Sequence, residues 1–367
     1  MSENQAQFEK RKQEHIVLAL DERVQAQDRS TWNDFSLEHE AFPEINFEEV
    51  DISTSSFFSP ADRRGETRAT GTSLGLTSGT KLSAPFFISS MTAGHEQGEK
   101  INTLLAGLSE RHQILMGVGS QRKELAHPEA GLEWRKIRKA HPDALLMANI
   151  GATQLVTHSI DQILSLSDSL GAVALIVHTN PLQEVLQKEG TPHFKFALKS
   201  LEAIVQKSKV PVVVKEVGFG FSVRTLKRLN EIGIAAVDVS GRSGTHWGKI
   251  EGYRSQDPIR EQAAETFQSW GKETLEVLRD SKGLGLKYQL WASGGVRTGL
   301  DVAKCIALGA DLVGVAQPWL KAALAGEQQL EELYQKLAFE LRTALFCTGS
   351  QNLDELYKRK VGVWRKI

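Results

Sequence analysis

The chain has 367 residues, 41% of them hydrophobic and 24% charged, a composition that is typical of a globular protein and excludes a disordered chain. Its formal net charge is only −1, so the overall charge favours neither nucleic acid nor an anionic membrane surface as a partner. The two cysteines, Cys305 and Cys347, have no metal-binding spacing and suggest no disulfide framework, which fits a reducing compartment.

The N-terminal residues Met1–Lys12 are polar and charged and lack the apolar segment of a secretory signal. No stretch reaches the about 18 apolar residues that a membrane span needs. We therefore expect a cytoplasmic protein without a membrane segment.

The first 84 residues are predicted to form an extension. Gln7–Asp28 has the pattern of a polar helix, and Trp32–Pro60 is irregular. Thr67–Leu82 is rich in Gly, Thr and Ser and contains the turn signal Thr77–Gly79. This segment predicts a hairpin that caps the floor of the following domain.

From Pro85 onward, short apolar runs alternate with longer amphipathic segments. Most runs are continuous and several are rich in Val and Ile, as expected of parallel strands covered on both faces. The predicted strands are Phe86–Met91, Leu115–Gly119, Leu145–Ile150, Val173–Val177, Val212–Val217, Ala236–Val239, Gln289–Ala292 and Leu312–Val315.

Helices are predicted between these strands. Val223–Ile232 repeats an apolar residue every third position, and Leu300–Leu308 has a similar pattern that stops at Gly309, a C-cap candidate. Gln328–Phe346 predicts a final helix, followed by a short tail.

Eight strand–helix units favour an α/β fold closed into a (β/α)8 TIM barrel. A doubly wound open sheet is the structural alternative, because strand order cannot be read from the sequence. We expect a single domain over 1–367, with an N-terminal helix and hairpin extension at 1–84, a barrel core at 85–320 and a C-terminal helix and tail at 321–367.

Nearly every predicted strand ends in, or is followed by, polar or loop residues. The carboxyl ends of barrel strands share one face, where active sites form. A single such residue is usually a helix cap or turn residue, but eight strand ends in register predict a site. In chain order these residues are Ser89, Ser90, Met91 and Thr92; Ser120, Gln121 and Arg122; Asn149; His178, Thr179, Asn180, Gln183 and Glu184; Lys215 and Glu216; Ser240 to Thr245 with Trp247; Gly294 to Arg297; and Ala316 with Gln317.

The last two strand ends have the pattern of a phosphate site. Gly294 and Gly295 allow the backbone to approach a ligand, and amides at the start of the next helix can bind phosphate. Ala307–Asp311 then leads into the eighth strand. The pattern predicts a site for FMN or a sugar phosphate, and the alternative is a tight turn without a ligand.

Two charged residues stand out near the middle of the barrel. Lys215, inside an apolar run, would be costly to bury without an anion. It could stabilise charge on a reduced flavin, form a Schiff base, or pair with Glu216. Glu184 could hold Mg2+ together with ligand phosphate, or could be an ordinary acid in the first turn of a helix.

Three basic residues, Arg11, Lys12 and His15, share one face of the N-terminal helix at helical spacing. Such a cluster suits a diphosphate, and the alternative is a solvated charged face.

The sequence resembles the type 2 isopentenyl-diphosphate isomerases from residue 11 to about residue 320. The N-terminal Arg-Lys-x-Glu-His pattern and the His-Thr-Asn-Pro-Leu-Gln-Glu segment are the most specific features. The matching segments are Arg11–His15, Ser90–Thr92, Gly117–Arg122, Ala148–Gly151, His178–Glu184, Val214–Gly218, Gly244–Thr245 with Trp247, Ser293–Arg297 and Ala307–Asp311.

The resemblance implies an enzyme that uses FMN and Mg2+, needs NADPH to reduce the flavin, and performs no net redox reaction. It assigns catalytic roles to Gln183, Lys215 and His178, and the metal to Glu184. The implied FMN contacts are Ser89, Ser90, Met91, Thr92, Ser120, Asn149, Lys215, Ser240, Thr245, Gly295, Val296, Arg297, Ala316 and Gln317. The implied substrate contacts are Arg11, Lys12, His15, Ser120, Gln121, Arg122, His178, Asn180, Gln183, Trp247 and Glu251.

The resemblance also implies a homo-oligomer, a tetramer or an octamer, in which the N-terminal basic residues can reach a neighbouring subunit. The chain departs from the family pattern at Ala93, Ser243 and His246, which puts local loop geometry in question and not the reaction class.

The implied reaction converts isopentenyl diphosphate to dimethylallyl diphosphate by a 1,3-allylic proton shift. Because an isolated alkene is a weak base and no cysteine stands at a strand end, the proton is expected to come from N5 of reduced FMN. The alternative is an FMN-dependent 2-hydroxy-acid oxidase. Such oxidases use a histidine in a Ser-Asn-His-Gly loop, whereas this chain has Ser240-Gly241-Arg242-Ser243-Gly244 there.

Overall fold

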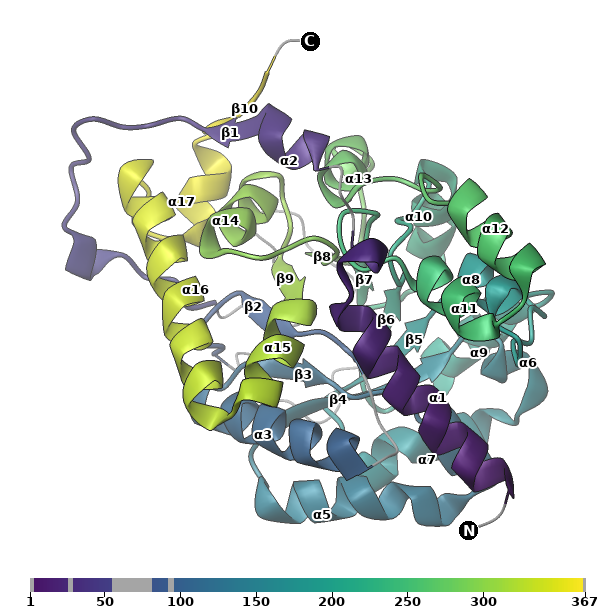
Figure 1. Cartoon of the computed structure of the whole chain (residues 1–367). Helices are drawn as coiled ribbons and strands as arrows, with labels where there is room; N and C mark the ends of the chain where they lie inside the picture. Colours follow the sequence, from purple (N-terminus) through teal and green to yellow (C-terminus); the bar gives the residue numbers. More distant parts are fainter. Residues whose placement is uncertain (1–2, 26–28, 55–80, 92–95, 366–367) are drawn as a thin grey trace.

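The computed structural model describes residues 3–25, 29–54, 81–91 and 96–365. Its centre is a closed barrel of eight parallel strands (Figure 1). The first and last strands pair, with Phe86 opposite Val313, so the predicted TIM barrel is confirmed and the open-sheet alternative is wrong. The strands are β2 (Phe86–Ile88), β3 (Leu115–Gly117), β4 (Leu145–Gly151), β5 (Ala174–His178), β6 (Val212–Lys215), β7 (Ala236–Asp238), β8 (Gln289–Ala292) and β9 (Leu312–Val315).

The barrel interior is filled by side chains from alternate strand positions. Phe87 packs against Trp291 inside the barrel, with ring centroids 5.2 Å apart and ring planes tilted by 56°, and both are buried. Their neighbours Phe86 and Ile88 point the other way, into the layer beneath the helices. This alternation explains why the strands are continuous apolar runs, since both faces of each strand are covered.

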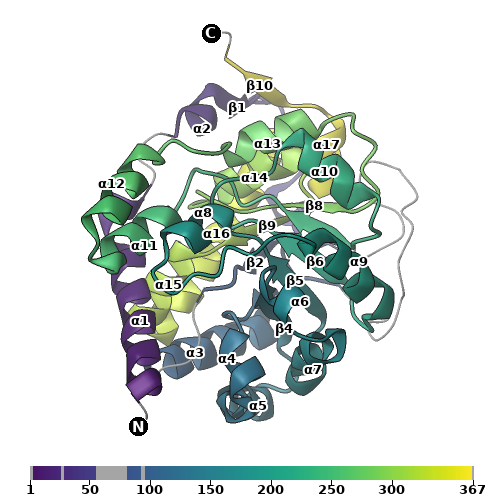
Figure 2. The ribbon, with the colours of Figure 1, turned by 90° about the vertical axis from the view of Figure 1, so that its right-hand side faces the viewer.

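Helices surround the strands (Figure 2). Gly309, with φ of +98°, follows the end of α14 as predicted for that helix. The helices around the barrel are α3 (Glu96–His112), α4 (Arg122–Ala126), η3 (Pro128–Gly131), α5 (Leu132–Ala140), α6 (Gln154–Thr157), α7 (Ile160–Leu170), α8 (Pro181–Leu186), α9 (Ala197–Lys207), α10 (Val223–Asn230), α11 (Trp247–Ser255), α12 (Pro258–Thr266), α13 (Thr274–Ser281), α14 (Gly299–Ala307), α15 (Gln317–Ala325) and α16 (Glu327–Cys347).

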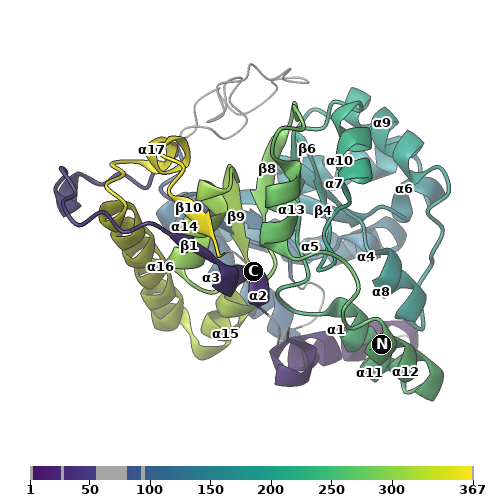
Figure 3. The same cartoon turned by 90° about the horizontal axis from the view of Figure 1, so that it is seen from above.

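The N-terminal helix α1 (Glu3–Leu20) packs against α11 and α15 and crosses one face of the molecule (Figures 1 and 3). It ends eight residues before the predicted Asp28. Asp21 has extended backbone and accepts the Arg23 N–H, which starts the short helix η1 (Glu22–Val24) instead. The chain therefore turns at Asp21 and runs over the barrel.

The described part of the region predicted to be irregular contains α2 (Ser30–Asp34), β1 (Phe35–Leu37) and η2 (Phe47–Glu49). The segment after the final predicted helix was expected to be a short tail. It instead contains α17 (Leu353–Lys358) and β10 (Gly362–Trp364). β1 and β10 pair antiparallel, with Phe35 opposite Trp364. This small sheet joins the N-terminal extension to the C-terminal segment.

The hairpin predicted at Thr67–Leu82 lies outside the described residues except for its last two. Leu82 pairs with Thr54 and is buried against the lower barrel interior. None of the helices in the described ranges combines the length and apolar character needed to cross a bilayer.

Candidate active site

A cleft at the carboxyl ends of the strands is built from three adjoining cavities. The largest holds about 890 Å³, part of it open to solvent, and shares Lys215 and Trp247 with a second cavity of about 550 Å³. The second shares His178 and Gln183 with a third of about 520 Å³. We call the first the glycine-loop cavity, the second the central cavity and the third the basic cavity. Barrel active sites form on this face.

The glycine-loop cavity takes its name from Gly294 and Gly295, which follow β8 with φ of +95° and +83°. A Cβ at Gly294 would lie 2.3 Å from the Gly241 carbonyl, and one at Gly295 would lie 2.4 Å from the Ser243 carbonyl. Only glycine fits both the backbone conformation and this close approach of two loops. The predicted glycine-rich turn is therefore packed tightly against the loop after β7. We call Gly294 and Gly295, with the loop residues Gly241 and Ser243 that they contact, the glycine cradle.

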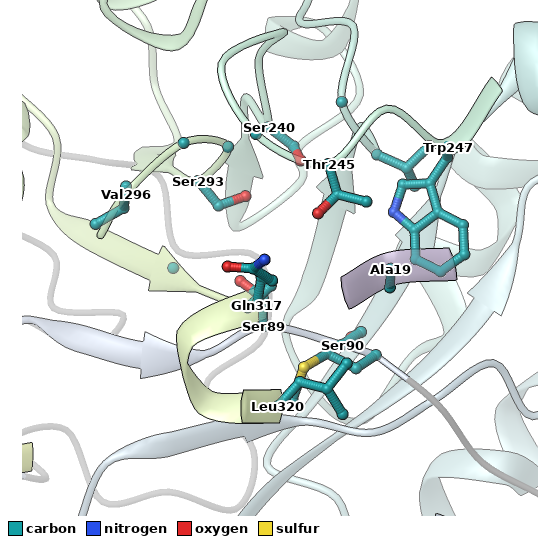
Figure 4. Close-up of a pocket in the computed structure, with 18 of the residues that line it drawn as sticks. Ala19, Ser89, Ser90, Ser240, Thr245, Trp247, Ser293, Val296, Gln317 and Leu320 are labelled. Carbon is teal, nitrogen blue, oxygen red and sulfur yellow. The ribbon is translucent and has the colours of Figure 1, made fainter. Parts of the chain in front are cut away.

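Two serines after β2 line the same cavity and point into it (Figure 4). The hydroxyls of Ser89 and Ser90 are buried and have no hydrogen-bond partner among the described residues. Buried polar groups are normally satisfied, so a polar ligand in this cavity would complete their bonding. The serines and the glycine cradle together fit a phosphorylated, polar cofactor such as FMN.

Lys215, at the end of β6, is buried and lines both the glycine-loop and central cavities. Its Nζ donates to the Glu216 carbonyl oxygen at 2.8 Å and to Ser240 Oγ at 3.4 Å. The Glu216 carboxylate instead accepts the backbone N–H groups of Val217, Gly218 and Phe219, and burial raises the pKa of Glu216 to about 7. Lys215 is thus bonded to the Glu216 backbone and not to its carboxylate.

Gln183 and Glu251 meet beside the central cavity. Gln183 Nε2 donates to Glu251 Oε1 at 3.0 Å, and His15 Nε2 lies 3.0 Å from the same oxygen. Arg254 Nε donates to the other oxygen at 2.9 Å. Burial by itself would raise the pKa of Glu251, but His15, Arg254 and the Gln183 hydrogen bond together lower it to about 2. Glu251 therefore stays ionised and fixes the side chains around it.

Trp247 forms the apolar wall of the cleft. Its ring lines the glycine-loop and central cavities (Figure 4) and meets the His15 ring edge-on at 5.5 Å. His15 belongs to α1, so the N-terminal helix covers the cleft of its own chain. Met91 lines the same two cavities, giving an apolar surface between polar ends.

The basic cavity is lined by Arg11 of α1, Arg122 of α4 and His178 of β5. His178 Nδ1 donates to Asn149 Oδ1 at 2.9 Å, and Asn149 Nδ2 donates to the Val118 carbonyl at 3.0 Å. This chain of bonds fixes the His178 ring. Two guanidinium groups beside an oriented imidazole can bind an anion with several charges.

Glu184 lies in the first turn of α8 and is buried. Its Oε2 accepts the Thr191 N–H at 2.7 Å and its Oε1 accepts from Asn180 Nδ2 at 3.2 Å. Asn180 Oδ1, also buried, has no partner among the described residues. Within the described ranges no three His, Cys, Asp or Glu residues come close enough to hold a metal. One carboxylate and one amide oxygen still fit Mg2+, which takes few protein ligands and completes its shell with water and phosphate.

Most predicted site residues line the cleft. Ser240, Thr245, Val296, Arg297, Ala316 and Gln317 join the glycine-loop cavity, and Ser120 and Asn149 the central one. Two described residues do not line it. Glu251 accepts a hydrogen bond from Gln183, which does line the cleft. Gln121 is turned toward β4 and accepts the Asn149 N–H at 3.0 Å. Thr92 and the side chain of Lys12 lie outside the described residues.

The unusual loop residues have structural partners. Ser243 Oγ donates to Glu273, which also accepts from Thr31 of the N-terminal segment. His246 is the N-cap of α11: its Nδ1 accepts the Lys249 N–H, and its Nε2 donates to the Phe267 carbonyl. Burial lowers the pKa of His246. Both ring nitrogens are used by the backbone, and Ala93 lies outside the described residues.

Sequence reasoning missed two residues beneath the cleft. Arg254 bridges Glu251 and Glu189, three residues after the acid on the same helix, so an i,i+3 pair was visible in the sequence. Asp238 ends β7 fully buried beside Lys215. The signal that singled out Lys215, a charge in an apolar run, was present at Asp238 as well.

A family profile described as FMN-dependent dehydrogenase matches residues 138–363. An isopentenyl-diphosphate delta-isomerase of Bdellovibrio bacteriovorus is 52% identical over 98% of this chain and 99% of its own length. One of Legionella pneumophila is 44% identical over 98% of this chain and 99% of its own. The chain belongs to the type 2 isopentenyl-diphosphate isomerase family. The resemblance drawn from its motifs is thereby confirmed.

Solved structures share the fold of this family member at low sequence identity. A mutant flavocytochrome b2 with pyruvate bound has a TM-score of 0.64 at 20% identity, covering 96% of this chain and 82% of that one. A mandelate oxidase variant has a TM-score of 0.57 at 16% identity, covering 94% and 89%. These similarities support the barrel alone.

Proposed function

We propose that this chain interconverts isopentenyl diphosphate and dimethylallyl diphosphate, with FMN in the glycine-loop cavity and the diphosphate in the basic cavity. The observation that carries the proposal is the continuity of the cleft. The glycine cradle with its unpartnered serines is joined to a cluster of Arg11, Arg122 and His178 through a wall formed by Trp247 and Met91.

FMN would be held by the glycine cradle, by Arg297, Ala316 and Gln317 at its rim, and by Ser89 and Ser90. Lys215 would place a positive charge beside it. Bound FMN, kept reduced by NADPH, supplies a nitrogen that can give and take a proton without net redox chemistry.

The diphosphate would be held by charge at the other end. Arg11 and Arg122 offer guanidinium donors, and His178 is oriented by Asn149. Mg2+ on Glu184, with the Asn180 amide oxygen, would neutralise the remaining phosphate charge. Binding energy from this end positions the carbon chain, which has few polar contacts of its own.

The double-bond shift adds a proton at one carbon and removes one from another. The amide of Gln183 is fixed at both ends, since Nε2 donates to Glu251 and Oε1 accepts from Asn180. An amide does not titrate near neutral pH, so Gln183 orients the substrate and is not the proton source. The face of Trp247 would stabilise positive charge that develops on the carbon chain and would exclude water.

The rival, oxidation of a 2-hydroxy acid, requires a base beside the flavin. The loop from Ser240 to Gly244 contains no histidine, and His246 bonds the backbone through both nitrogens. These features argue against an oxidase.

The test uses purified protein loaded with FMN and Mg2+, with the flavin photoreduced or left oxidised. We expect dimethylallyl diphosphate from isopentenyl diphosphate only with reduced flavin. Bleaching of oxidised flavin by lactate or mandelate, with no isomer formed in either state, would replace this proposal with the oxidase. Light scattering would test the expected tetramer or octamer.

A further inference from the structure

Asp238 connects three strand ends beneath the glycine-loop cavity. Its carboxylate accepts Ser293 Oγ at 2.8 and 2.9 Å and the Ser240 N–H at 3.3 Å. The Lys215 ammonium lies 4.0 Å from Oδ2. Asp238 is 1% exposed, so little water weakens these interactions.

The three partners all line the glycine-loop cavity, and Asp238 does not. Lys215 belongs to the end of β6, Ser240 follows β7 and Ser293 follows β8. Figure 4 shows Ser240 and Ser293 at the cavity wall. Asp238 can therefore act on a ligand there only through these neighbours and through its charge.

Lys215 and Asp238 lie side by side and buried: burial raises the pKa of Asp238, while the Lys215 charge and the hydrogen bonds from Ser293 and Ser240 oppose this and favour the carboxylate. The other nearby carboxylate, Glu216, is occupied by three backbone N–H groups on the loop after β6. Lys215 donates to the Glu216 carbonyl and to Ser240 Oγ, which leaves its third N–H for a ligand. An ammonium with a carboxylate beside it presents less positive charge than an ammonium alone.

We infer that Asp238 is a positioning residue that holds the Lys215 ammonium at the wall of the glycine-loop cavity and offsets part of its charge toward the flavin. The inference rests on the proposed function, because it assumes that FMN occupies this cavity. Reduced flavin carries more electron density than oxidised flavin. Offsetting the positive charge therefore disfavours the reduced state and keeps the reduction potential lower.

The experiment compares the wild type with Asp238→Asn and Asp238→Ser, which remove the charge and keep a polar group for Ser293. FMN affinity is measured by fluorescence titration of the apoprotein, and the two-electron potential is measured by equilibration with a reference dye. Lys215→Met serves as the control of opposite sign. Two Asp238 variants are used because one of them can fail to fold.

In both Asp238 variants we expect the ratio of the affinity for reduced FMN to the affinity for oxidised FMN to be at least tenfold higher than in the wild type. This change corresponds to a positive shift of the reduction potential of about 30 mV or more. Lys215→Met should shift the potential the other way. A purely structural role would weaken both redox states equally, so an unchanged potential in a folded, FMN-loaded Asp238 variant overturns the inference. An unchanged potential in Lys215→Met also overturns it. A wild-type chain that binds no FMN would refute the proposed function instead.

Discussion

The side chain of Gln183 is bonded to Glu251 at 3.0 Å, and Glu251 has no exposed surface. One residue comes from the start of α8 and the other from the middle of α11, 68 positions later. Because His15 and Arg254 contact the same carboxylate, Glu251 joins the N-terminal helix to two helices of the barrel. The central part of the cleft is organised around this buried charge.

Replacing Glu251 with Gln should reduce stability in a pH-dependent way. The pKa of Glu251 is depressed to about 2 in the folded chain, below its ordinary value, so its contribution is present above about pH 4.3 and is lost as pH falls toward 2. The shift corresponds to roughly 3 kcal/mol. Urea unfolding at pH 7 and pH 3 measures the free energy of unfolding of both proteins. The difference in this free energy between wild type and Glu251→Gln should be smaller at pH 3 than at pH 7. An equal difference at the two pH values would contradict the assignment.

The same variant should lower kcat on the order of 100-fold, because the new amide has one acceptor oxygen where the carboxylate had two, so Gln183 competes with His15 and Arg254 for it. Glu189→Gln is the matched control. Glu189 bonds Arg254 as Glu251 does, but it does not contact Gln183. Steady-state kinetics should show a small change in Glu189→Gln, and equal losses in the two variants would refute an orienting role for Glu251.

Replacing Gly295 with Ala should weaken FMN binding on the order of 100-fold. The new Cβ would meet the Ser243 carbonyl at 2.4 Å in a backbone conformation that disfavours side chains, a distortion worth about 3 kcal/mol. Gly283→Ala is the control, since Gly283 also has positive φ, +78°, and has nothing within 4 Å of a Cβ. Titration of the apoproteins with FMN should separate the two variants. Equal affinities would show that the cradle does not bind the cofactor.

Replacing Glu184 with Gln should raise the Mg2+ concentration required for half-maximal activity on the order of 10- to 100-fold, because a hard cation loses its charged ligand. Glu202→Gln, an exposed acid on α9, is the control and should leave the requirement unchanged. The measurement is initial rate against free Mg2+. A normal Mg2+ requirement in Glu184→Gln would remove Glu184 from the metal site.

Replacing His246 with Ala should cost about 1 to 2 kcal/mol of stability, since α11 loses its N-cap. The pH profile of kcat should keep its shape, because both ring nitrogens serve the backbone and not the substrate. Thermal unfolding and a pH–rate profile check the two parts. Loss of one limb of the profile, with kcat reduced more than 100-fold, would identify His246 as a base.

The barrel was predictable because its strands are continuous apolar runs. The limits of β8 and β9 match those predicted, and the apolar runs stop at Ser293 after β8 and at Ala316 and Gln317 after β9. The run from Phe86 to Met91 was predicted too long. The strand ends at Ile88, although the Ser89 N–H still donates to the Val315 carbonyl, and the next two residues are serines that line the cavity. The sequence still favours a strand at these positions, but the residues line the cavity instead, so the strand is shorter than its pattern predicts.

Contacts between distant segments could not be predicted. β1 and β10 are three residues each, too short for a periodic pattern, and they pair across almost the whole chain. The bond between Gln183 and Glu251 depends likewise on how α11 packs against α8. Sequence patterns identified the strand-end residues one by one, but the barrel geometry determines which of them share a hydrogen bond.

The most direct measurement is an anaerobic incubation of the purified protein with FMN, NADPH, Mg2+ and isopentenyl diphosphate, in which dimethylallyl diphosphate formed is counted against NADPH oxidised. The proposed function predicts product in large excess over NADPH, because the reduced flavin is used without being consumed. Product equal to or less than the NADPH oxidised, or no product while the flavin is fully reduced, would contradict it.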